Sequence, residues 1–119
     1  MAKSILLVED HTLSRQSFAT FLVREGYEVT DVGDGETALE VLAKSPFDLV
    51  ITDQRLPTRV NGIEVLAHQS RIESGKGILV TGFGSEEVQK QARALGVEYM
   101  EKPVLLADLL HKVRELLRA

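Results

Sequence analysis

A few side chains that could act together are spread along this chain: the acidic pair Glu9-Asp10, then Asp53, Thr81 and Lys102. Two carboxylates about 4 Å apart repel each other by about 4 kcal/mol at an effective dielectric constant near 20. A cluster of three would therefore be protonated unless a cation held it. Carboxylate oxygens are the ligands that Mg²⁺ prefers, so these acids indicate a divalent-cation site if the fold brings them together.

The elements that must position these residues can be read from the hydropathy pattern. Short apolar runs predict buried strands, and longer amphipathic segments predict helices with one buried face. The expected strands are Ser4–Val8, Glu28–Val32, Asp48–Thr52, Gly77–Thr81 and Val97–Glu101. The expected helices are Thr12–Arg24, Glu36–Lys44, Gly62 to about Ser74, Ser85–Leu95 and Leu105–Leu117. Strands and helices thus alternate five times.

This alternation predicts the fold class and the place of the site. A (βα)5 chain forms an α/β three-layer sandwich, a doubly wound parallel sheet with helices on both faces. Such sheets bind ligands at the carboxyl ends of their strands. Glu9-Asp10, Asp53, Thr81 and Lys102 all fall at predicted strand ends. Each alone is also typical of a chain reaching the surface, but their joint placement favours one shared site.

The composition excludes several classes of function. The chain has 119 residues, 44% hydrophobic and 27% charged, which is typical of one globular domain. A net charge of −4 with few aromatic residues argues against a nucleic-acid surface. The chain has no cysteine, no apolar run long enough to span a membrane and no apparent signal peptide. We therefore expect a cytoplasmic domain without a membrane segment.

The strand-end residues belong to four short motifs: Glu9-Asp10, Asp53-Gln54-Arg55-Leu56-Pro57, Thr81-Gly82 and Lys102-Pro103. In this order and spacing, the motifs resemble those of the receiver domain of two-component response regulators. The resemblance covers about residues 4–118 and implies a single receiver domain over residues 1–119. It also implies a flavodoxin-like, CheY-like five-stranded sheet of order 2-1-3-4-5, in which the first and third strands are neighbours.

The resemblance assigns a role to each residue of the motifs. Asp53 would be the phosphoacceptor, taking a phosphoryl group from the phosphohistidine of a sensor histidine kinase or phosphotransfer protein. Glu9, Asp10, Asp53 and the backbone carbonyl of Arg55 would hold Mg²⁺ or Mn²⁺. Lys102 would pair first with Asp53 and later with the phosphoryl group. The domain would catalyse only its own phosphorylation and dephosphorylation, so it is not expected to be an enzyme in the ordinary sense.

A conformational switch is implied as well. The Thr81 hydroxyl would move toward the phosphoryl oxygens, and Tyr99 would swing inward into the vacated space, which Gly82 leaves open. The readout surface would comprise Ser85–Leu95 and Val97–Arg118, and would contact a downstream effector protein or domain or form a phosphorylation-dependent dimer. Its mixed charges favour a protein partner over nucleic acid.

Further positions match the family or depart from it. The bond before Pro103 is expected to be cis. Four residues separate Pro57 from Gly62, one more than in most receivers, so the loop after Asp53 is longer. Arg55 and Phe83 occupy positions that tune the approach of water to the acyl phosphate, and we expect them to slow its hydrolysis.

Other interpretations remain open at this stage. A degenerate receiver would act as a phosphorylation-independent protein-binding module, although every catalytic position is filled. A flavin-binding electron carrier would need a phosphate cradle where Glu9-Asp10 stands, and an aspartyl-phosphate phosphatase would need Asp-x-Asp there. On the first helix, Leu13 or Val23 is expected to be exposed and could dock a kinase, whereas His11 is expected to be a solvated residue.

Overall fold

The computed structural model describes residues 2–71, 75–82 and 85–118. Within these ranges, the strands are β1 Ser4–Val8, β2 Glu28–Val32, β3 Leu49–Asp53, β4 Lys76–Thr81 and β5 Glu98–Glu101. The helices are α1 Thr12–Arg24, α2 Gly35–Lys44, α3 Gly62–Gln69, α4 Glu86–Leu95 and α5 Leu106–Leu116. The predicted alternation is therefore confirmed. Each helix in these ranges is too short or too polar to cross a lipid bilayer.

The prediction for the end of α3 was wrong, since this helix stops at Gln69 and the expected end at Ser74 lies outside the described residues. The side chain of Gln69 is buried, and its amide donates hydrogen bonds to the backbone oxygens of Phe47 and Lys76. These bonds attach the end of α3 to the segment before β3 and to the start of β4. The hydroxyl of Ser70 then bonds back to the carbonyl of Ala67, a local contact that competes with further helix.

The five strands form one parallel sheet of order β2-β1-β3-β4-β5, which confirms the expected topology. Its register is what positions the functional residues. Val8 on β1 pairs with Thr52 on β3, so the next residues along the two strands are Glu9 and Asp53. Asp53 in turn pairs with Val80 on β4. The order of the strands reverses at β1 and β3, where ligands of doubly wound sheets bind.

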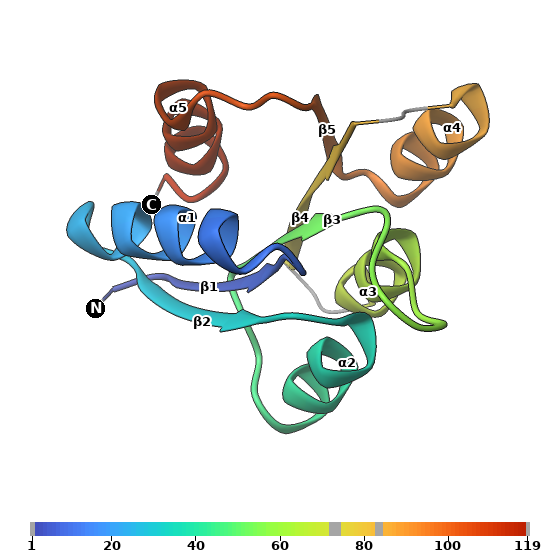
Figure 1. Cartoon of the computed structure of the whole chain (residues 1–119), viewed down its shortest axis with the longest axis horizontal. Coiled ribbons are helices and arrows are strands. Elements are labelled where there is room, and N and C mark those ends of the chain that lie inside the picture. Colours follow the sequence, from blue (N-terminus) through green and yellow to red (C-terminus); the bar gives the residue numbers. More distant parts are fainter. Residues whose placement is uncertain (1, 72–74, 83–84, 119) are drawn as a thin grey trace.

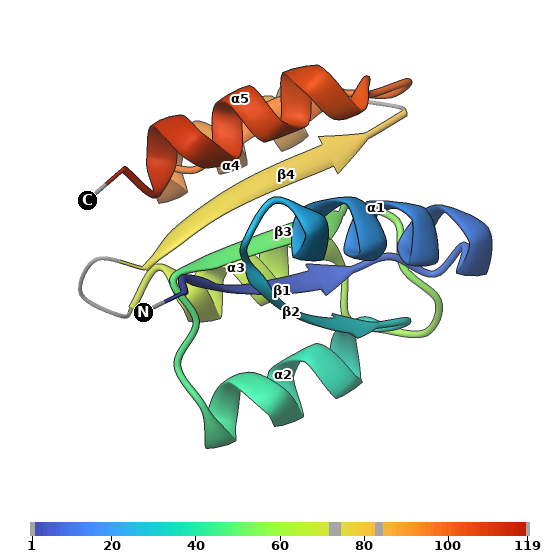
Figure 2. The ribbon, with the colours of Figure 1, turned by 90° about the vertical axis from the view of Figure 1, so that its left-hand side faces the viewer.

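Helices cover both faces of the sheet, with α1 and α5 on one face and α2, α3 and α4 on the other (Figures 1 and 2). Successive residues of a strand point to opposite faces, so each strand contributes to two apolar layers. The layer under α1 and α5 includes Ile5, Leu7, Leu22, Leu49, Ile51, Ile78, Val80, Leu109 and Val113. The opposite layer includes Leu6, Val8, Val32, Ala38, Val50, Val65, Leu66, Leu79 and Ala92.

Helix α5 differs from expectation at its start. Leu106, Leu109 and Val113 have the spacing of one helical face, but Leu106 is 37% exposed, whereas Leu109 and Val113 are buried. The preceding Leu105 makes no side-chain capping bond and is 66% exposed. The first turn of α5 therefore presents apolar side chains to solvent, at the same edge of the sheet as Lys102.

Candidate functional site

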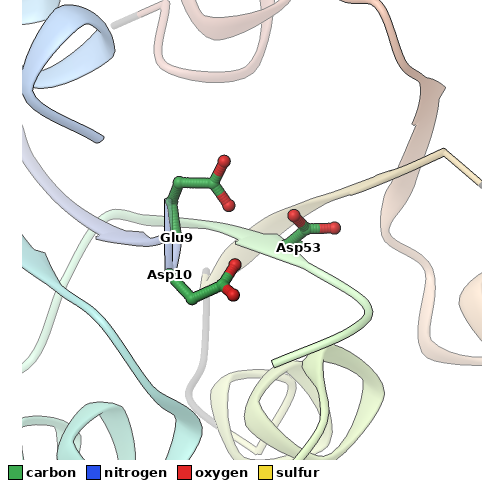
Figure 3. Close-up of side chains that lie close together, drawn as sticks. All are labelled: Glu9, Asp10 and Asp53. Carbon is green, nitrogen blue, oxygen red and sulfur yellow. The ribbon is translucent and has the colours of Figure 1, made fainter. Parts of the chain in front are cut away.

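Three carboxylates meet at the carboxyl edge of the sheet (Figure 3). Glu9 and Asp10 directly follow β1, and Asp53 is the last residue of β3. One oxygen from each side chain lies within 4.8 Å of the others. Glu9 and Asp53 are only 5% and 9% exposed, whereas Asp10 is open to solvent. The parallel register of β1 and β3 explains why residues so far apart in sequence come together.

Lys102, which directly follows β5, completes this cluster. Its Nζ lies 2.5 Å from Asp53 Oδ2 and 3.5 Å from Glu9 Oε1. The backbone N–H of Lys102 donates to the carbonyl of Thr81 at 3.0 Å, which extends the pairing of β4 and β5 past the end of β5. The following bond, to Pro103, is cis, as the resemblance implied. The ammonium thus reaches both buried acids from a fixed backbone position.

The electrostatics show that one ammonium does not balance three carboxylates. The pKa of Glu9 is raised from 4.5 to about 7, first by burial and then by the hydrogen bond and charge of Asp53, although Lys102 partly opposes this. Burial by itself would lower the pKa of Lys102, but Asp53 and Glu9 outweigh burial and raise it. The site therefore holds an excess of negative charge in a place partly shielded from water.

The residues present fit a hard divalent cation. Glu9 Oε2 is buried and accepts no hydrogen bond from any described residue. Such an orphaned carboxylate oxygen costs stability unless something binds it. The atoms that Glu9, Asp10 and Asp53 offer to a metal are all carboxylate oxygens, which are the ligands that Mg²⁺ and Mn²⁺ prefer. A cation here would also relieve the repulsion that raises the pKa of Glu9.

The loop after Asp53 is attached at its base. The backbone N–H of Gly62 donates to the carbonyl of Gln54 at 3.1 Å, and that of Ile63 donates to the Gln54 side chain at 3.0 Å. A Cβ at Gly62 would lie 2.3 Å from the Asp53 carbonyl oxygen, so a glycine is needed there. Arg55, two residues after Asp53, begins the exposed part of the loop. Pro57 is likewise exposed.

The expected switch residues lie on β4 and β5 and just after β4. Thr81 is buried at the end of β4, and Gly82 is open, with a built Cβ 3.9 Å from Lys102 Cβ. Tyr99 on β5 packs against the layer under α4, and its hydroxyl is buried without a hydrogen bond among the described residues. The ring as a whole is half-buried in this structure. Phe83 lies outside the described residues.

Arg15 was missed from the sequence, whereas His11 is exposed as expected and in addition caps a helix. Arg15 on α1 donates to the backbone carbonyl of Glu9 at 2.9 Å and pairs with Asp31 at 3.1 Å. Helical side chains point back toward the start of their helix, and this direction could have suggested the contact with Glu9. His11 is the N-cap of α1 and accepts a hydrogen bond from Ser14 N–H at 3.3 Å, so it has a structural role.

Comparison with known proteins agrees with this geometry. The sequence model of the response regulator receiver domain matches residues 5–114. CpdR, a response regulator receiver protein of Brucella abortus, is 32% identical over 119 residues, which cover 98% of each chain. The transcriptional regulatory protein PdtaR of Mycobacterium tuberculosis is 32% identical over 110 residues, or 91% of this chain and 53% of PdtaR. The chain belongs to the response regulator receiver domain family of two-component systems.

Solved structures extend the similarity to the whole fold. A CheY-like receiver domain protein from Methanospirillum hungatei has a TM-score of 0.91 at 33% identity, with 97% of this chain and 93% of that chain covered. The receiver domain of sensor histidine kinase PA1611 from Pseudomonas aeruginosa, solved with magnesium coordinated in its active-site cleft, has a TM-score of 0.83 at 25% identity over 100% of each chain. The chain spans about half the length of the first curated relatives that it matches.

Proposed function

We propose that residues 4–118 form one receiver domain that accepts a phosphoryl group on Asp53 from a histidine kinase or phosphotransfer protein. The observation that carries this proposal is the contact of Asp53 Oδ2 with Lys102 Nζ at 2.5 Å, next to two further acids. An ionised carboxylate attacks phosphorus through its lone pairs, so it must be kept free of a proton. The ammonium pairs with Oδ2 of Asp53, and the second oxygen of Asp53 takes no part in that contact.

In this proposal Glu9, Asp10, Asp53 and the backbone carbonyl of Arg55 hold Mg²⁺ or Mn²⁺. When bound, the cation neutralises the carboxylates and attracts the oxygens of the incoming phosphoryl group. Lys102 holds Asp53 in place before transfer and binds a phosphoryl oxygen afterwards. Its compact ammonium suits a single point contact of this kind. The donor would obtain its phosphoryl group from ATP, which places the reaction in the cytoplasm.

Phosphorylation can be tested without knowing the cognate kinase. The protein is incubated with acetyl phosphate and Mg²⁺, and its intact mass is followed. We expect the mass of one phosphoryl group to be added in the native protein, and none in Asp53→Asn or in excess chelator. A native protein that gains no mass with Mg²⁺ would leave only the alternative, a receiver that binds its partners without phosphorylation.

The switch is a second part of the proposal. Phosphorylation adds roughly −1.5 to −2 charges and three acceptor oxygens. The buried hydroxyl of Thr81 then donates to one of them, and the packing of Tyr99 changes with it. Beryllofluoride, a stable mimic of the phosphoryl group, allows this to be followed by NMR. We expect shifts at Tyr99 and along α4 in the native protein, and a much weaker response along α4 in Thr81→Ala.

For the partner kinase, we propose docking at the edge of α1 and α5 nearest the site. Leu13 is 72% exposed and lines one groove with Leu106. Val23 is also exposed, but it lies at the other end of α1. Leu13→Ser should slow phosphotransfer from a phosphorylated histidine protein while leaving labelling by acetyl phosphate unchanged. Val23→Ser is the matched control and should change neither reaction.

A further inference from the structure

The loop between β3 and α3 is held by a second element that the proposed chemistry does not use. In this loop, the hydroxyl of Thr58 donates a hydrogen bond to a carboxylate oxygen of Glu36, and the N–H of Arg59 donates to the same oxygen at 3.3 Å. Glu36 lies in the first turn of α2, whose N-cap is Asp34. The start of α2 and the loop lie side by side (Figure 1).

Thr58 has an unusual backbone conformation, with φ of 72°. This left-handed region is unfavourable for a β-branched residue and persists only where neighbouring groups hold it. The bond to Glu36 supplies such a constraint on the side chain, and the bond from Arg59 supplies one on the backbone. The loop after Asp53, although longer than in most receivers, is therefore held in one backbone conformation at Thr58.

The packing next to Glu36 is equally close. A Cβ at Gly35 would lie 2.5 Å from the carbonyl oxygen of Val60 and 2.7 Å from its Cβ. The backbone of α2 thus lies directly against the loop, as only a glycine permits. The contact is polar at Glu36 and steric at Gly35, so it fixes the position of the loop in two independent ways.

The carboxylate of Glu36 contacts the loop through Oε2. Its Oε1 is shielded from solvent and accepts no hydrogen bond from any described residue. The hydrogen bond from Thr58 lowers the pKa of Glu36, so the group stays ionised at neutral pH. A shielded carboxylate oxygen without a partner costs stability, and positions of this kind are commonly tied to function.

We propose that Glu36 is a positioning residue: it holds the loop of residues 54–61 in the shape that presents the backbone carbonyl of Arg55 to the cation. This inference rests on the proposed function of the acidic site. The loop is attached at its base through Gln54 and at its tip through Glu36, and Arg55 lies between the two attachments. Release of the tip leaves the carbonyl of Arg55 free to turn away from Asp53.

The test compares Glu36→Ala with Glu40→Ala, which removes the same charge from an exposed position of the same helix. Amide hydrogen exchange of residues 56–60 is measured without metal, and the dissociation constant of Mg²⁺ alone is measured by calorimetry. In Glu36→Ala we expect faster exchange in the loop and a Mg²⁺ dissociation constant about three- to tenfold higher, as a coupling of ordinary size implies. Glu40→Ala should match the native protein in both measurements.

Thr58→Val separates positioning from charge, because it removes the hydroxyl donor and keeps every charge. It should weaken Mg²⁺ binding and loosen the loop as Glu36→Ala does, and the double variant should be little worse than either single variant. Glu36→Gln keeps an acceptor oxygen and should therefore lose less Mg²⁺ affinity than Glu36→Ala. Urea denaturation checks that each variant is folded. If Glu36→Ala does not fold, Thr58→Val takes its place as the test variant.

Two results would overturn the positioning role. The first is a Glu36→Ala protein that binds Mg²⁺ with native affinity. The second is weaker Mg²⁺ binding in both Glu36→Ala and Glu36→Gln but native binding in Thr58→Val, which would assign the effect to the charge of Glu36. In either case a native protein that still binds Mg²⁺ and is phosphorylated retains its proposed function. A native protein that binds no Mg²⁺ refutes both the proposed metal site and the role of Glu36 toward it.

Discussion

Neutralising Glu9 should stabilise the metal-free domain, although it damages the site. In Glu9→Gln, an amide of nearly the same shape replaces a buried acid whose Oε2 lacks a hydrogen-bond partner among the described residues. The amide also offers an N–H group that Asp53, close beside it, could accept. The substitution therefore removes mainly the cost of burying a negative charge beside Asp53.

The size of this effect follows from the pKa of Glu9, which is about 7 in the folded protein against 4.5 for the free side chain. As pH rises from about 4.5 to 7, the unfolded chain loses this proton first, so the stability of the folded state falls. Each pKa unit corresponds to about 1.36 kcal/mol, which makes the cost about 3 kcal/mol at pH 8 and less than about 1 kcal/mol at pH 5. Glu9→Gln should recover most of that difference.

Urea denaturation in excess chelator measures this directly, with the free energy of unfolding determined at pH 5 and pH 8. We expect Glu9→Gln to be more stable than the native protein by about 2 to 3 kcal/mol at pH 8, and by much less at pH 5. Glu40→Gln makes the same charge change on an exposed part of α2 and should stay within about 0.5 kcal/mol of the native protein. Added Mg²⁺ should raise the free energy of unfolding more in the native protein than in the Glu9→Gln protein.

Either of two outcomes would refute this reasoning. A Glu9→Gln protein less stable than the native one at pH 8 without metal would mean that the charged carboxylate is well satisfied. An equal gain at pH 5 and pH 8 would mean that the effect does not come from ionisation of Glu9.

Three further predictions concern the groups around the acids. Gly62→Ala should lower the free energy of unfolding by about 1 to 3 kcal/mol in thermal denaturation, because the new Cβ collides with the Asp53 carbonyl. A Cβ at Gly82 makes only an ordinary contact, so Gly82→Ala should lie within about 0.5 kcal/mol of the native protein. Lys102→Met should raise the pKa of Glu9 above its native value in carboxyl ¹³C NMR titrations, because the ammonium lowers it; an unchanged pKa would contradict the contact. Arg15→Ala should weaken Mg²⁺ binding, measured by calorimetry, because it releases the Glu9 carbonyl, and Arg15→Lys should bind more tightly than Arg15→Ala; equal, native-like binding by both would exclude the role.

Much of the site could be predicted from sequence because it depends on strand order. Glu9, Asp53 and Lys102 each follow or end a short apolar run, and parallel strands carry such positions to the same edge. The spacing of the motifs then identified the family, and the family implied the order of the strands.

What could not be predicted depends on contacts between elements. The bond from Thr58 to Glu36 joins side chains on different elements, and no periodicity encodes it. The direction of helical side chains could suggest that Arg15 reaches Glu9, but not that it bonds to the backbone carbonyl. Exposure of Leu106 depends on how α5 meets the sheet rather than on its apolar stripe. The burial of the Tyr99 hydroxyl is likewise a matter of packing, since the strand pattern gives no rotamer.

We propose that Asp53, and no other residue, accepts the phosphoryl group next to a metal held by the neighbouring acids. The most direct measurement is to locate the group after incubation with acetyl phosphate, by reducing the acyl phosphate with borohydride and mapping the altered residue by peptide mass spectrometry. We expect reduction at Asp53 alone, and only with Mg²⁺ or Mn²⁺ present. Reduction at another carboxylate, or equal reduction at Asp53 in excess chelator, would contradict this proposal.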